Sequence, residues 1–135
     1  MAVLDRAALL AAVGSASLPI EKVDVPELGG EVYIRGMSGT ERDEWESSLV
    51  IGAGRKHQRL NTDNIRARLV TRTLCDEQGG RLLQNSDAAI LGGLRVDVLT
   101  RLYEVAQRLS GVTDKDVDEL GKLSAPADGN GSPTN

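Results

Sequence analysis

Histidine and cysteine are the side chains from which metal or nucleophilic chemistry is most often built, and this sequence has one of each. His57 lies in a basic loop and Cys75 near the end of an expected helix, and neither has further ligands at zinc-site spacing. A Cys–His pair would need tertiary folding to bring the two together. The simpler interpretation is a solvated loop histidine and a half-buried cysteine, which has no partner for an internal disulfide.

Two other patterns have some of the spacing of ligand sites. The acidic run DKDVDE, residues 114–119, alternates acids as a calcium loop does, but it lacks the glycine at the sixth position and the closing glutamate. The glycine pairs at 29–30, 79–80 and 92–93 do not open a helix with phosphate-loop spacing, so we interpret them as turns. Without paired acids, an activated nucleophile or a phosphate loop, the sequence predicts no enzyme, no metal and no cofactor.

Basic side chains gather in the middle of the chain and raise the hypothesis of a nucleic-acid-binding regulator. Against it stand the net charge of −4 of the chain and the lack of aromatic residues for base stacking in the basic patch, so we expect no nucleic-acid partner. The candidates are Arg55, Lys56, Arg59, Arg66, Arg68 and Arg72.

Trp45 is the only tryptophan and lies in a charged segment. Tryptophan is favoured both in cores and at the centres of interfaces, so both interpretations stay open. Our hypothesis for a partner-binding site is Trp45, Leu49 and Val50.

Composition favours a small domain in a reducing cytoplasm. Phenylalanine is absent, so aliphatic residues must fill most of the core. The apolar start MAVLDRAALLAAVG is interrupted by Asp5 and Arg6, which indicates a short helix over residues 3–13 and not a signal peptide. No stretch has the roughly 20 apolar residues of a membrane span, so we expect no membrane partner.

The elements that would position these residues begin with a β-hairpin. IEKVDVPEL and EVYIRGM flank Gly29-Gly30, a turn that would pair Val25 with Ile34 and place the proline-containing strand at a sheet edge. Ser38 and Glu41 have capping-box spacing, so we predict a helix from Gly39 to residue 52 or 54.

Helical periodicity continues toward the C-terminus. It predicts helices over residues 62–75, a short one capped by Ser86 through 88–91, a long one over 95–111, and a last candidate within 114–123. The fold class is α+β and mostly α-helical, with a small antiparallel hairpin packed with four to five helices. Residues 1–123 form one domain, and the small polar residues of 124–135 predict a disordered tail.

The order of these segments resembles the tail assembly chaperones of long-tailed bacteriophages, in particular of siphophages that infect actinobacteria. YIRGMSGTERDEWE carries the Arg35-Gly36, Ser38 and Glu41-Arg42 positions of the family pattern, and LCDEQGGRLL carries Asp76, Gly79 and Arg81. The resemblance covers about residues 20 to 112, whereas the GAGRKHQR loop and the tail depart from it.

This resemblance implies a protein that binds the tape measure protein and keeps it soluble and extended until major tail protein polymerises around it. It also implies a longer frameshifted form, weak self-association, a place in the host cytoplasm during infection, and absence from the mature virion. The alternative function is a structural head-tail connector or tail completion protein of the virion.

Overall fold

A computed structural model describes residues 2–52, 54, 56 and 59–124, and for residues 120–124 it describes the backbone alone. Along the first half the elements are α1 (Arg6–Ser15), β1 (Ile20–Val25), the 3₁₀ turn η1 (Pro26–Leu28), β2 (Gly30–Arg35), α2 (Gly39–Ser48), β3 (Val50–Ile51) and β4 (Arg59–Leu60). Along the second half they are α3 (Ile65–Thr73), β5 (Leu74–Cys75), the 3₁₀ turn η2 (Asn85–Asp87), α4 (Ala88–Leu91), α5 (Val96–Ser110) and α6 (Asp114–Ser124). The expected α+β class, mostly α-helical with a small antiparallel sheet, is confirmed.

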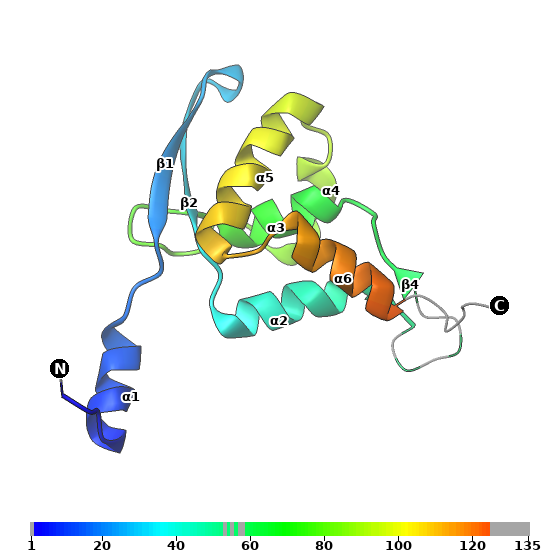
Figure 1. The fold of residues 1–135 in the computed structure, drawn as a ribbon. Coiled ribbons are helices and arrows are strands. Elements are labelled where there is room, and N and C mark those ends of the chain that lie inside the picture. Colours follow the sequence, from blue (N-terminus) through cyan, green and yellow to red (C-terminus); the bar gives the residue numbers. More distant parts are fainter. Residues whose placement is uncertain (1, 53, 55, 57–58, 125–135) are drawn as a thin grey trace.

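The other elements of the fold are arranged around the long hairpin β1–β2. β5 pairs antiparallel with β2, so the strand order is β1-β2-β5, and β1 is an edge strand as its neighbouring proline predicts. Helix α5 runs along the hairpin, α3 and α4 lie beside it, and α2 packs at the lower end (Figure 1). A second sheet of two short strands, β3 and β4, follows α2.

The core lies between one face of the hairpin and the helices. Val25 and Ile34 contribute from the strands, and the stripe on α5 contributes Val98, Leu102 and Ala106. The predicted apolar stripe of the long helix is therefore core. That helix ends as predicted, because Gly111 takes the left-handed conformation with φ of 69° that favours glycine.

Salt bridges join α5 to the outer edge of the hairpin. The Arg108 guanidinium lies 2.7 Å from the Glu21 carboxylate, and that of Arg101 lies 2.5 Å from Glu27. The hydrogen bond from Arg101 holds the pKa of Glu27 at about 2, well below its usual range. These pairs are open to water, so they contribute more to the orientation of α5 than to stability.

The predicted register of the hairpin is wrong by four residues. Val23 pairs with Val32 and Val25 with Gly30, because Pro26 starts a 3₁₀ turn that ends at Gly29 in the left-handed conformation with φ of 82°. The reversal therefore uses four residues instead of Gly29-Gly30. An even shift leaves every side chain on its predicted face, so the valines still point toward the core.

Several helix ends also differ from expectation. α1 begins at Arg6, with the Asp5 carboxylate accepting from the backbone N–H of Ala8, and it continues through Gly14. α2 stops at Ser48 because β3 follows at once, and η2 and α4 are preceded by a Gln84/Asp87 capping arrangement instead of Ser86. Apart from Ser124, the tail predicted over 124–135 lies outside the described residues.

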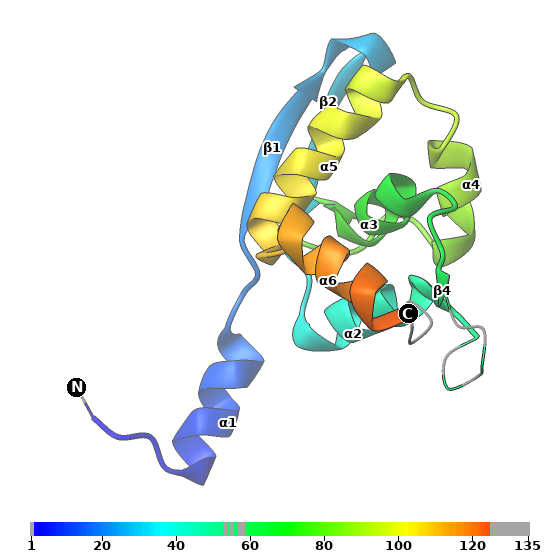
Figure 2. The same cartoon turned by 45° about the vertical axis from the view of Figure 1, so that its right-hand side comes forward.

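Helix α1 stands away from the rest of the chain in both views (Figures 1 and 2). None of its residues is buried, and the connector Ala16–Pro19 joins it to the base of β1. A helix of ten residues is marginal in water without tertiary packing. The apolar side chains of α1 are therefore uncovered in the free chain.

Candidate partner-binding surface

The hairpin is joined to the start of α2 by a partly buried ion pair. Arg35, the last residue of β2, donates two hydrogen bonds to the Glu41 carboxylate, at 2.7 and 2.6 Å. Glu41 also accepts from the backbone N–H of Ser38 at 2.9 Å, while the Ser38 hydroxyl accepts from the backbone N–H of Glu41 at 3.2 Å. The predicted capping box is therefore confirmed, and its carboxylate also binds the end of the strand.

This ion pair shifts the pKa values of both side chains in the direction that favours their charged forms. The hydrogen bonds from Arg35 lower the pKa of Glu41 to about 2, and the Glu41 carboxylate raises the pKa of Arg35. The next residue along the chain, Gly36, lies close to the backbone of α5. A Cβ on Gly36 would collide with the backbone carbonyl oxygen of Leu109, so glycine permits close contact between the strand and α5.

The structure brings Trp45, Leu49 and Val50 together at the end of α2 but does not expose them equally. Trp45 and Leu49 are 0% exposed and belong to the hydrophobic core, and Val50 is half-buried in β3, where it pairs with Leu60. The core interpretation of the tryptophan therefore describes the free chain. Contact of these three residues with a partner stays a prediction, and it would require α2 or β3 to move.

The arginines of α3 are placed differently from one another. Arg68 donates to the backbone carbonyls of Ser48 and Asn61 and so joins α3 to the segment around β3 and β4. Arg72 is buried and donates to the carbonyl of Arg68, and burial lowers its pKa. Arg66 is exposed and lies 5.8 Å from the ring centroid of Tyr103.

The remaining candidates for chemistry do not meet in a site. His57 and Arg55 lie outside the described residues. Cys75 is buried, and desolvation raises the pKa of its thiol, which keeps it protonated. Within the described ranges, no group of three or more His, Cys, Asp and Glu side chains could hold a metal ion, and no helix is long and apolar enough to cross a membrane.

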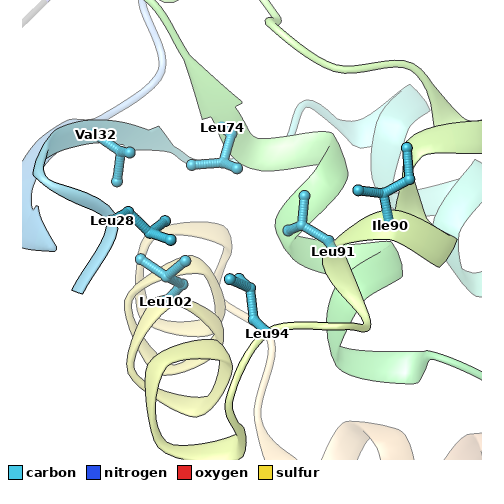
Figure 3. A pocket seen from close by; sticks show the side chains of 7 residues that line it. All are labelled: Leu28, Val32, Leu74, Ile90, Leu91, Leu94 and Leu102. Atoms are coloured by element: carbon cyan, nitrogen blue, oxygen red, sulfur yellow. The ribbon is translucent and has the colours of Figure 1, made fainter.

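An apolar hollow opens between the tip of the hairpin and α4 (Figure 3). Its volume is about 160 Å³, and every residue that lines it is aliphatic. Val32, Leu74 and Leu102 line the inner part, whereas Leu28 from η1 faces Leu91 and Leu94 across the opening (Figure 3). We call this surface the leucine hollow.

The rim of the leucine hollow is exposed. Leu28 is 56% exposed and Ile90 is 78% exposed, and Val96 at the start of α5 is also exposed. Sequence reasoning missed this surface because it assigned Leu28 to a strand and predicted the short helix at 88–91 without a neighbour for it. The available signal was an isoleucine and a leucine at consecutive positions in a helix too short to bury both.

The arrangement of these elements is similar to that of a solved phage protein. The chain is similar to the solved structure of the bacteriophage HK97 tail assembly chaperone, with a TM-score of 0.52 and 22% sequence identity. The match covers 78% of this chain and 97% of the other. No protein-family model and no curated protein matches the chain.

Proposed function

We propose that this protein is a tail assembly chaperone that binds the tape measure protein and keeps it soluble and extended until major tail protein polymerises around it. The observation that carries the proposal is the shared fold, which extends over nearly the whole of the HK97 tail assembly chaperone. The segment order that resembles the family in sequence supports the same proposal, because the Arg35–Glu41 pair and the close contact at Gly36 fall on the positions that carry the resemblance.

The surface is suited to reversible binding of an apolar client. Charged residues cover much of the chain, but α1 and the leucine hollow leave aliphatic side chains open to water. Exposed apolar patches rimmed by polar residues mark sites of protein interaction. Many weak contacts along a long client would give strong binding that assembly of the tail can still displace.

The proposal includes further partners and a location. We infer weak self-association, interaction with a longer frameshifted form of the same chain, and transfer of the client to major tail protein. The protein then acts in the host cytoplasm during infection and is absent from the mature virion. The alternative, a head-tail connector or tail completion protein, predicts that the chain is present in the mature virion.

Two measurements test the function. Co-expression of the chain and its longer form with tape measure protein should move that protein from the insoluble to the soluble fraction, and the complex should co-purify. Equal insolubility with and without the chaperone would refute the proposal. Mass spectrometry of purified virions is the second measurement, and stoichiometric presence of the chain in particles would favour the connector.

A further inference from the structure

The chain carries two uncovered apolar surfaces that lie at opposite ends of the hairpin. One is α1 with the residues before it, where the exposed apolar side chains are Val3, Leu4, Leu9, Leu10 and Val13. The other is the leucine hollow, which opens beside Leu28 at the hairpin tip. Each surface costs free energy while it faces water, and each has the chemistry to cover the other.

We propose that α1 of one copy docks into the leucine hollow of a second copy. This deepens the self-association that belongs to the proposed function and rests on it to that extent. The absence of charge on both surfaces favours α1 as the occupant of the hollow. From Ala7 to Ser15 the helix has no ionisable side chain, and the hollow is lined by aliphatic residues alone. Docking of this part of α1 in the hollow would therefore bury no charge.

Size also favours a side chain over a small molecule. The hollow of about 160 Å³ is smaller than the roughly 300–1,000 Å³ typical of small-molecule pockets. Its open side, between Leu28 and Leu94, can admit leucine side chains from a helix laid across it. Leu9 and Val13 are four positions apart and therefore share one face of α1, with Leu10 beside them.

The same chain could supply the helix only by folding α1 back along β1. The connector Ala16–Pro19 starts at the base of β1, and its four residues span at most about 14 Å. The six residues of β1 span about 20 Å and separate this base from the hairpin tip. α1 accordingly lies at the end of the molecule away from that tip (Figure 1).

The geometry of this contact determines its strength and symmetry. Different patches meet on the two copies, so the contact is heterologous. One short helix in one hollow buries much less than the roughly 1,200–2,000 Å² of a stable interface, so association is weak and depends on concentration. Covering α1 also stabilises it as a helix, because a partner then supplies the packing that its own chain lacks.

The test uses two charge variants of the full chain and a matched control. Leu9→Glu with Leu10→Glu alters α1, and Leu28→Glu with Ile90→Glu alters the rim of the hollow. All four side chains are about half exposed or more, so the variants should fold, which circular dichroism checks. The control is Leu82→Glu, at an exposed leucine outside both surfaces.

Sedimentation velocity over a concentration series gives the readout. Each double variant should weaken self-association about tenfold or more, and Leu82→Glu should leave it unchanged. A mixture of the two double variants should form a heterodimer and nothing larger, since one variant retains an intact hollow and the other an intact α1. Failure of the mixture to associate, or double variants that associate like the wild type, would overturn the proposal.

Two further results would also overturn it. One is a wild-type chain that stays monomeric throughout the series. The other is a compaction that the α1 variant removes but that does not depend on concentration, which would mean that α1 docks within its own chain. Solubilisation of tape measure protein is measured separately in the same variants, so a failed docking proposal is distinguished from a failed chaperone function.

Discussion

Replacing Glu41 by Gln isolates the charge of the Arg35–Glu41 pair from the rest of the capping box. Glutamine keeps a side-chain oxygen that can accept from the backbone N–H of Ser38, as capping boxes with Gln do. It removes the negative charge that faces the buried Arg35 guanidinium. We expect a loss of stability that comes mainly from the unpaired arginine.

The magnitude follows from the pKa of the carboxyl group. A pKa lowered from 4.5 in the unfolded chain to about 2 in the folded protein corresponds to about 3.4 kcal/mol of stability at neutral pH. The Glu41 side chain is 21% exposed, so water screens part of this interaction and we expect about 2–3 kcal/mol. Because the folded pKa is the lower one, this stability is present above 4.5 and is lost as pH falls toward 2.

The assay is denaturant unfolding of the wild type and of Glu41→Gln at about pH 7 and about pH 3. The two proteins should differ by about 2–3 kcal/mol at the higher pH and by less than half of that at the lower one, where the Glu41 carboxyl is already protonated in the unfolded chain but still largely ionised in the folded protein. A difference below about 0.5 kcal/mol at pH 7, or one of the same size at both pH values, would refute the reasoning.

Three other substitutions test the core and the client surface. Leu102→Ala should lower the free energy of unfolding by about 2–5 kcal/mol in the same assay, because the side chain is buried beneath the hairpin; a change under about 0.5 kcal/mol would mean that the stripe faces outward. Trp45→Ala should cost about 3–5 kcal/mol, whereas an unchanged melting temperature with lost solubilisation of tape measure protein would identify an interface anchor instead. Gly36→Ala should cost about 1–3 kcal/mol through overpacking against α5, with unfolding faster than in the wild type, and wild-type stability would show that the carbonyl of Leu109 can move away.

Local signals in the sequence predicted the parts of the fold that depend on neighbours along the chain. Ser38 and Glu41 define the start of α2, and the spacing of Val98 and Leu102 defines the buried face of α5. Both signals act within one or two helical turns. They therefore needed no knowledge of the tertiary structure.

The parts that sequence reasoning missed depend on contacts across the chain. The two residues of β5 could not be separated from α3 by propensity, because they become a strand only when Cys75 pairs with Tyr33. The partner of Arg35 also depends on the register, because the four-residue reversal places Asp24 opposite Glu31, and Arg35 pairs with Glu41. The leucine hollow combines residues from five separate elements and a loop, and no local signal in the sequence indicates that they meet.

The pairing of β2 with β5 also sets the order in which the domain can mature during synthesis. α1 and then the hairpin leave the ribosome before the other elements, but Ile34 on the inner face of the hairpin is covered only after α3 and α5 have been made. Until then the nascent chain exposes an apolar hairpin and an apolar α1 together. The nascent chain is therefore most prone to aggregate before residue 110 emerges. Translation of many copies from one messenger would raise the local concentration of such chains and so favour their aggregation.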